Sequence, residues 1–219
     1  MQTNARPKIV AVAGNIGAGK SSLVEWLEQQ LGMVPCFEPH AENPYLAEFY
    51  GDMQRWGLHS QLFFLIHRFR IHKDIEARAE SARRNIVQDR TIYEDAEIFA
   101  AQLHTSGAIV DRDWKMYSDL YSTLRGELRP PDLMIYLRCP VNVLTKRIRK
   151  RGRSFEQTIP RKYLAALHEL YEAWFDRYSD SPKIVIPTDR VDYVEQLFDR
   201  QELLQEIRTR LSQEPESSR

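Results

Sequence analysis

A short glycine-rich segment near the start of the chain restricts the possible folds more than any other feature. Residues 14–21 read GNIGAGKS, the pattern GxxxxGK[ST], between the apolar run KIVAVA and the helix-like run SLVEWLEQQL. Glycines let consecutive backbone N–H groups point at one anion, and the start of a helix favours negative charge. A strand, this loop and a helix in that order predict a phosphate site in an α/β protein.

Four further short β-rich runs follow, each with a longer helical pattern after it. Together with residues 8–13, the predicted strands lie at residues 33–37, 86–88, 133–137 and 183–186. Strands that alternate with helices predict a parallel sheet covered by helices on both faces. The first run is almost continuously apolar, which is typical of a central strand buried on both sides.

Helices are indicated by apolar residues at helical spacing and by one capping pattern. The spacing predicts long amphipathic helices around residues 58–80 and 163–174. Thr91-Ile-Tyr-Glu94 fits a capping box, so a helix is expected to begin just after the third strand.

Composition narrows the class of protein. The 219 residues favour one domain over residues 1–219, with a core at about 8–194 and a frayed tail at about 213–219. Lys plus Arg (31) balances Asp plus Glu (31), so no overall positive field would hold a nucleic acid. Cys36 and Cys139 lack the spacing of a disulfide framework or a zinc site. No apolar run suits a signal peptide or a membrane span, so a cytoplasmic protein is expected.

Carboxylates follow two of the predicted strands. Glu38 comes after the second strand, and Asp89 with Arg90 ends the third. Because parallel strands bring their carboxyl ends to one edge, these residues and Lys20 are expected to share a cleft. Taken singly, each fits a solvated surface charge better than a site. The chain has no NKxD and no DxxG, so a GTPase switch is not indicated.

These segments together resemble the deoxynucleoside kinase family, from residue 8 to about 194. The matching segments are GNIGAGKSS, FEP, NPYLAEFY, the W-x4-Q of Trp56 to Gln61, QDRTIYED and RIRKRGRSFEQTIPRKYL. The resemblance implies a P-loop NTPase fold: a five-stranded parallel sheet with helices on both faces and an arginine-rich lid. It further implies a kinase for nucleotide salvage that moves the ATP γ-phosphate to the 5′-hydroxyl of a deoxynucleoside, and a homodimer.

The resemblance also implies roles for the charged residues. Lys20 would reach the phosphates of ATP, and Ser21 and Asp89 would hold Mg²⁺, Asp89 through water. Glu38 would take the proton from the attacking hydroxyl, and Arg90 would bridge the 5′-oxygen and the transferred phosphate. The family usually has Glu-Arg-Ser where this chain has Asp-Arg-Thr, so Asp89 stays a second candidate for the base.

Two sets of ligand-binding residues follow from the same resemblance. The ATP-binding set is Gly14, Asn15, Ile16, Gly17, Ala18, Gly19, Lys20, Ser21, Ser22, Arg147, Arg151, Arg153, Asp192 and Tyr193. The deoxynucleoside-binding set is Glu38, Tyr50, Trp56, Gln61, Arg68, Arg90, Asp95 and Glu156. Tyr50 and Glu156 fall on positions that bind the sugar 3′-hydroxyl. Arg68 and Asp95 together, with Gln61, favour a purine or cytosine over thymine. Among these bases the segment ENPYLAEFY resembles bacterial purine deoxynucleoside kinases, so deoxyadenosine or deoxyguanosine is expected first and deoxycytidine next.

Alternatives remain at this stage. The six cations between Lys146 and Arg153 also fit a solvated helix or a nucleic-acid patch. A nucleoside-monophosphate kinase would use the same loop, although carboxylates around its cleft would oppose a charged acceptor. A non-catalytic nucleotide-binding scaffold would keep the same fold.

Overall fold

A computed structural model describes residues 6–37, 43–189 and 197–212, without the side chains of residue 155 and residues 197–200. Five strands form one parallel sheet in the order β2-β3-β1-β4-β5. Their bounds are β1 Ile9–Gly14, β2 Val34–Cys36, β3 Ile86–Asp89, β4 Leu133–Arg138 and β5 Lys183–Pro187. The five predicted strands and the central place of the first are confirmed.

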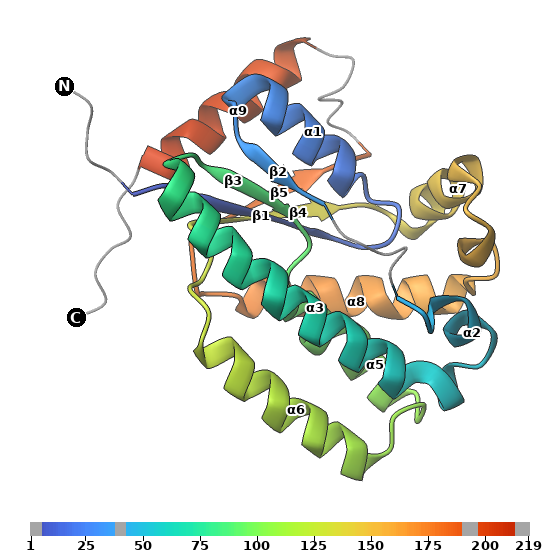
Figure 1. Cartoon of the computed structure of the whole chain (residues 1–219). Helices are drawn as coiled ribbons and strands as arrows, with labels where there is room; N and C mark the ends of the chain where they lie inside the picture. Colours follow the sequence, from blue (N-terminus) through green and yellow to red (C-terminus); the bar gives the residue numbers. More distant parts are fainter. Residues whose placement is uncertain (1–5, 38–42, 190–196, 213–219) are drawn as a thin grey trace.

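Helices connect the strands and cover both faces of the sheet. They are α1 Lys20–Leu31, α2 Leu46–Gly51, α3 Met53–Ala82, α4 Ile92–Glu94, η2 Asp95–Ala100, α5 Ala101–Thr105, α6 Asp111–Gly126, α7 Val141–Arg151, η3 Ser154–Glu156, α8 Arg161–Arg177 and α9 Leu197–Ser212. Helices α1 and α9 lie on one face, and α3 and α8 lie on the other, with α6 further out (Figure 1). The two predicted amphipathic helices are confirmed as α3 and α8.

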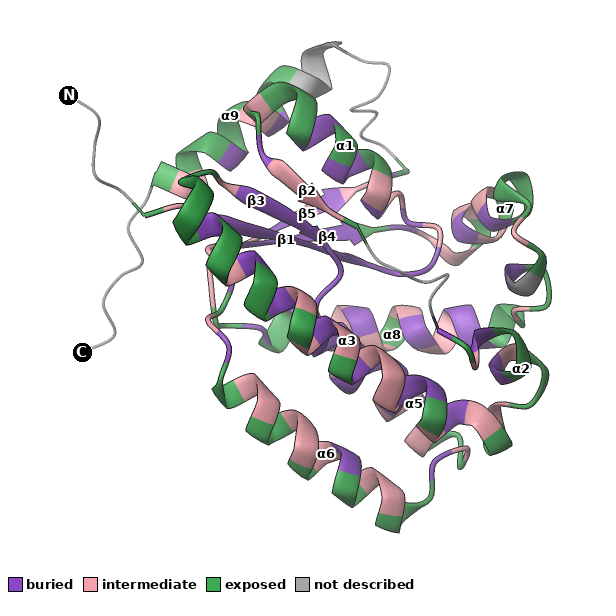
Figure 2. Ribbon diagram, viewed as in Figure 1, coloured by how far each residue is buried: buried purple, intermediate pink, exposed green. Residues whose placement is uncertain are grey.

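Strand β1 shows why the sheet is buried on both sides. Its side chains alternate: Val10 and Val12 pack with the α1 and α9 layer, while Ala11 and Ala13 pack with the α8 layer. All six residues of β1 are buried, and β1, β3 and β4 form the buried centre of the molecule, whereas β2 at the sheet edge is of intermediate burial (Figure 2). Helix α9 adds Leu203 and Ile207 to the first layer, so the packed core continues past residue 194.

The segment after β3 is one helical stretch with a change of winding. It begins at the predicted capping box, because Thr91 and Glu94 each bond to the other's backbone N–H. Residues Asp95–Ala100 then form a π-helix before α5 continues the stretch. A π-turn holds one residue more than an α-turn, and such turns are frequent at functional sites.

Strand pairing sets the loops after β1 and β3 side by side. Val12 of β1 is in register with Asp89 of β3, and the Arg90 N–H donates to the Val12 carbonyl at 2.9 Å. The phosphate loop after β1 therefore faces the Asp-Arg-Thr segment after β3, as expected for a parallel sheet. Among the helices of the described residues, none is long and apolar enough to cross a membrane.

Candidate active site

The loop between β1 and α1 has the backbone of a phosphate loop. Gly17 and Gly19 have φ angles of +81° and +103°, in the left-handed region that side-chain-bearing residues avoid. A Cβ at Gly17 would lie 3.0 Å from Ile148 Cγ1 and 3.3 Å from the Leu144 carbonyl oxygen, so helix α7 packs against the loop there. Glycine is needed at this position for both conformation and space.

Lys20 points back into the loop from the first turn of α1. Its Nζ donates to the carbonyls of Gly14 at 2.9 Å and Asn15 at 3.2 Å. Gly19 is the N-cap of helix α1 and has no side chain that could cap the helix. The loop thus presents an ammonium and the positive end of a helix to the same space, which suits the phosphates of a nucleotide.

Ser21 and Asp89 form a pair that fits a Mg²⁺ site. Ser21 Oγ donates to Asp89 Oδ2 at 2.7 Å, and Asp89 is almost fully buried. The other oxygen, Asp89 Oδ1, is buried and has no hydrogen-bond partner among the described residues. A hydroxyl beside a carboxylate with a spare oxygen is the donor set that Mg²⁺ takes next to phosphates and water. Among the described residues, no three or more His, Cys, Asp or Glu side chains are grouped so that they could hold a metal ion. A Mg²⁺ ion at Ser21 and Asp89 would therefore also need phosphate oxygens and water as ligands.

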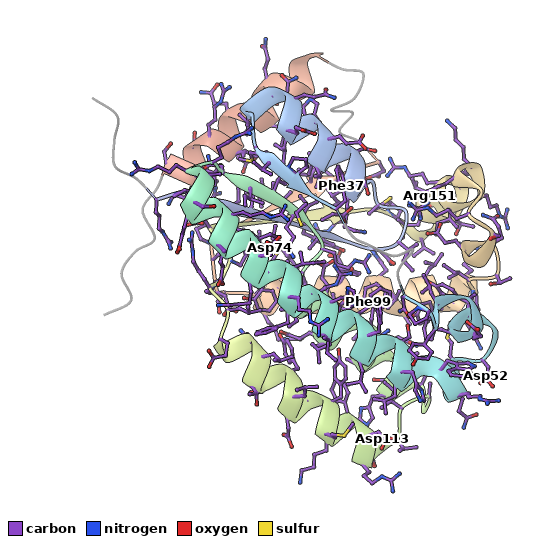
Figure 3. All side chains as sticks on the ribbon, in the orientation of Figure 1. Phe37, Asp52, Asp74, Phe99, Asp113 and Arg151 are labelled. Atoms are coloured by element: carbon purple, nitrogen blue, oxygen red, sulfur yellow. The ribbon has the colours of Figure 1, made fainter. Side chains whose placement is uncertain are left out.

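Arg90 has an unusual left-handed backbone. Its φ is +68°, one of two positive values for non-glycine residues in the described chain. Its Nη2 donates to the Gly14 carbonyl at 3.3 Å, and its guanidinium carbon lies 4.4 Å from the centre of the Phe99 ring. The guanidinium therefore lies between the phosphate loop and Phe99, which Figure 3 labels in the middle of the molecule.

Three residues predicted to read the base are buried. Arg68 of α3 and Asp95 of η2 form a buried ion pair, 3% and 2% exposed. Gln61 of α3 is also buried, and its Oε1 has no hydrogen-bond partner within the described part of the chain. Trp56 of α3 stacks on Tyr45 with ring centres 5.7 Å apart. A solvated helix face is therefore rejected for Gln61 and Arg68.

The predicted lid residues fall into two groups. Arg151 at the end of α7 and Arg153 both pair with the buried Glu156, at 2.6 and 3.4 Å. Arg147 instead donates to the Ala18 carbonyl at 3.1 Å and to the Thr188 carbonyl at 2.8 Å. Arg147 thus ties the phosphate loop to the end of β5.

The structure also brings in residues to which the sequence patterns gave no role at the active site. Glu94, Tyr163 and Tyr171 are all buried. Glu94 accepts hydrogen bonds from Thr91 and Tyr171, and Tyr163 lies near enough to Tyr50 and Arg90 to interact with them electrostatically. Burial raises the pKa of Tyr163 well above its ordinary value, Tyr50 raises it further, and Arg90 lowers it slightly, so the hydroxyl stays protonated. In the sequence, both tyrosines read only as apolar positions of an amphipathic helix.

Three predicted residues lie outside the described residues: Glu38, Asp192 and Tyr193. Tyr50 of α2 is partly buried and packs against the core. Helix α2 also contacts the η3 turn that carries Glu156. The remaining loop residues Ile16, Ala18 and Ser22 lie in the phosphate loop and the first turn of α1.

The site combines the buried strand β1, the glycine-rich loop, Lys20 pointing into that loop, and the Ser21–Asp89 pair. These features define a P-loop protein that binds nucleotide phosphates. Comparison with known proteins then gives its family. A model of the family "Deoxynucleoside kinase" matches residues 10–212. The chain belongs to the deoxynucleoside kinase family.

Relatives and solved structures agree with this placement. The chain is 36% identical over 215 residues to the deoxyadenosine kinase of Lactobacillus acidophilus, covering 93% of this chain and 96% of the relative. It is 36% identical over 186 residues to the deoxyadenosine/deoxycytidine kinase of Bacillus subtilis, covering 84% of each. The structure of deoxyadenosine kinase from M. mycoides with bound dATP superposes with a TM-score of 0.80 at 28% identity, covering 92% of this chain and 99% of that one.

The protein is therefore an enzyme, an ATP-dependent deoxynucleoside kinase of the P-loop NTPase fold. The predicted family, fold class and activity are confirmed. A nucleoside-monophosphate kinase and a non-catalytic scaffold are not favoured by these relatives.

Proposed function

We propose that this kinase phosphorylates the 5′-hydroxyl of a purine deoxynucleoside, deoxyadenosine or deoxyguanosine, in nucleotide salvage, with Mg-ATP as donor. Deoxycytidine is the next-ranked acceptor. The observation that carries the base preference is the buried Arg68–Asp95 pair, together with the buried Gln61 on the same helix as Arg68.

The buried pair supports a base that offers both donors and acceptors. A guanidinium and a carboxylate held together present fixed donors and acceptors, and the Gln61 amide adds one of each. Arg68 is packed beside Phe64, with its guanidinium carbon 5.8 Å from the ring centre. In the proposed pose, Arg68 would occupy space that a thymine methyl needs. The relatives named above are a deoxyadenosine kinase and a deoxyadenosine/deoxycytidine kinase, which supports deoxyadenosine as an acceptor.

On the donor side, the loop backbone and Lys20 would bind the phosphates of ATP. Ser21 and Asp89 would hold Mg²⁺, which when bound neutralises charge on the phosphates. The lid arginines Arg151 and Arg153 would supply further positive charge, and Arg147 would keep the loop anchored to β5. Asp192 and Tyr193 are proposed to border the donor adenine.

On the acceptor side, Glu38 would remove the proton from the 5′-hydroxyl as its oxygen attacks the γ-phosphorus in line. Arg90 would bridge that oxygen and the transferred phosphate. Tyr50 and Glu156 would bind the 3′-hydroxyl, and Trp56 would border the base. Close packing of Tyr50 and Glu156 around the sugar would leave little room for a 2′-hydroxyl, so a deoxyribose is expected. A homodimer, a cytoplasmic location and the absence of nucleic-acid partners stay predictions.

One panel tests the acceptor class. The enzyme is given Mg-ATP with each deoxynucleoside and, separately, with each deoxynucleoside monophosphate, and the phosphorylated products are identified. We expect 5′-monophosphates from deoxynucleosides and no turnover of monophosphates. Turnover of monophosphates alone would contradict the proposed acceptor, and bound ATP without any turnover would indicate a scaffold.

A further inference from the structure

The carboxylate of Glu94 is shared by three parts of the active site. Glu94 is fully buried. Its Oε1 accepts hydrogen bonds from the Gly14 backbone N–H at 3.1 Å and the Tyr171 hydroxyl at 2.8 Å. Its Oε2 accepts from the Thr91 N–H at 2.9 Å and the Thr91 hydroxyl at 3.3 Å. One side chain thus joins the phosphate loop, the segment after β3 and helix α8.

These contacts exceed what a helix cap requires. A capping box needs one acceptor oxygen at this position, and glutamine serves as well as glutamate. Here the second oxygen is used by Gly14 and Tyr171, 80 and 77 residues away in the chain. A glutamine could not accept at both ends, because one of its two terminal atoms is a donor. The sequence has glutamate where the site needs two acceptors.

The same carboxylate lies next to Arg90. The Arg90 Nε is 3.9 Å from Glu94 Oε1, and both side chains are buried. Gly14 donates its N–H to Glu94 and accepts from Arg90 Nη2 with its carbonyl, so the three residues form a closed set of contacts. Arg90 also holds a left-handed backbone, which relaxes unless neighbouring contacts fix it.

We propose that Glu94 is a positioning residue for phosphoryl transfer. It fixes the guanidinium of Arg90 and the first residue of the phosphate loop in one arrangement before the substrates bind. Burial raises the pKa of Tyr171 well above its ordinary value, so its hydroxyl remains a donor to Glu94 over the working pH range. The inference rests on the role given to Arg90 in the proposed function.

The first test replaces the carboxylate by an isosteric amide. We expect Glu94→Gln to lower kcat by about 10- to 100-fold, the effect usual for a residue that orients a catalytic group, with KM for the deoxynucleoside within about threefold of wild type. Glu97→Gln is the matched control: it lies in the same helical stretch and accepts a hydrogen bond from Tyr121 at 2.7 Å, away from the loop. Wild-type kcat in a folded Glu94→Gln enzyme would overturn the inference.

A double-mutant cycle separates positioning from general stability. We expect the double variant Glu94→Gln, Arg90→Gln to be no slower than Arg90→Gln alone, because Glu94 acts through Arg90. If the fold-losses in kcat of the two single variants multiply in the double variant, the inference is overturned. Full activity of Arg90→Gln would overturn both the role of Arg90 and the inference, whereas an inactive Arg90→Gln beside a normal Glu94→Gln would overturn the inference alone.

A milder variant covers the case in which Glu94→Gln does not fold. Tyr171→Phe removes a single donor to Glu94 and keeps the ring that stacks on Tyr136, with centres 5.7 Å apart. We expect kcat to fall by about two- to tenfold with the melting temperature nearly unchanged. An unchanged kcat would overturn the link between α8 and Arg90.

Discussion

We propose that one carboxylate removes the proton from the acceptor, and the contacts of Asp89 favour Glu38 for that role. Asp89 accepts the Ser21 hydroxyl at 2.7 Å, which suits a residue that works with Mg²⁺ rather than a base. We expect Glu38→Gln to lower kcat by roughly 10²- to 10⁴-fold, with little change in deoxynucleoside affinity, because the amide cannot accept a proton. Asp89→Asn should instead raise the Mg²⁺ concentration needed for half-maximal rate.

Steady-state kinetics over a Mg²⁺ series checks both variants. Glu48→Gln, an exposed residue of α2, is the matched control and should behave as wild type. If Glu38→Gln keeps nearly full activity while Asp89→Asn is inactive at saturating Mg²⁺, the two roles are reversed.

Single residues differ in how far the sequence predicts their contacts. Lys20 and Ser21 could be assigned because the loop motif fixes their spacing and chemistry. Glu94 could be read only as a cap, since its bond to Gly14 joins residues 80 positions apart. Arg147 was assigned to the lid, yet its bond to Ala18 spans 129 positions and holds the loop in place. Contacts between residues so far apart in the chain depend on tertiary packing, which a local sequence pattern does not specify.

Among the elements, the phosphate loop depends on close packing against α7. In Gly17→Ala, the new Cβ would meet Ile148 at 3.0 Å in a left-handed backbone. We expect the KM for ATP to rise at least about tenfold, since a loss of about 1.4 kcal/mol in binding has that effect. Activity is measured over an ATP series with the deoxynucleoside saturating.

Gly32→Ala separates loop geometry from backbone strain. Gly32 also has a left-handed φ, +62°, but a Cβ there meets nothing within 4 Å. Both variants should lose about 1 kcal/mol of unfolding free energy from the strained backbone. Only Gly17→Ala should lose ATP affinity, and equal kinetic effects in the two variants would contradict the packing argument.

The helical stretch after β3 shows where prediction from sequence stops at the level of elements. Its start could be predicted because the capping box is a local pattern of two residues, Thr91 and Glu94. The π-helix at Asp95–Ala100 could not, because the same residues fit a regular helix. In the π-helix, Asp95 is buried against Arg68 of α3. This contact joins two helices, and no local sequence pattern specifies it.

For the whole molecule, buried His72 makes stability depend on pH. Burial lowers the pKa of His72 below 6.5, and its Nε2 lies 2.8 Å from the Arg129 carbonyl, which a neutral ring satisfies as donor. The unfolded chain therefore binds a proton that the folded chain does not. The contribution of neutral His72 to the free energy of unfolding is fully present above pH 6.5. It is lost as the pH falls toward the lower pKa that His72 has in the folded protein.

Denaturant unfolding between pH 7.5 and about pH 5 tests this dependence. We expect the unfolding free energy of wild type to fall below pH 6.5 by up to about 1.4 kcal/mol per pH unit, and His72→Gln to remove most of that slope. His59→Gln, at an exposed position of the same helix, should keep it. An unchanged slope in His72→Gln would show that another group is responsible.

The choice of base tests the account most directly, because it depends on the fold, the buried pair and the family together. The measurement is kcat/KM for the four natural deoxynucleosides, on wild type and on the double variant Arg68→Met, Asp95→Ala. We expect wild type to prefer a purine deoxynucleoside, since sites built on buried hydrogen-bonding groups discriminate by about 10⁴-fold or more. The double variant should shift toward thymidine. Wild type preferring thymidine, or a double variant with unchanged preference, would contradict the assignment of Gln61, Arg68 and Asp95.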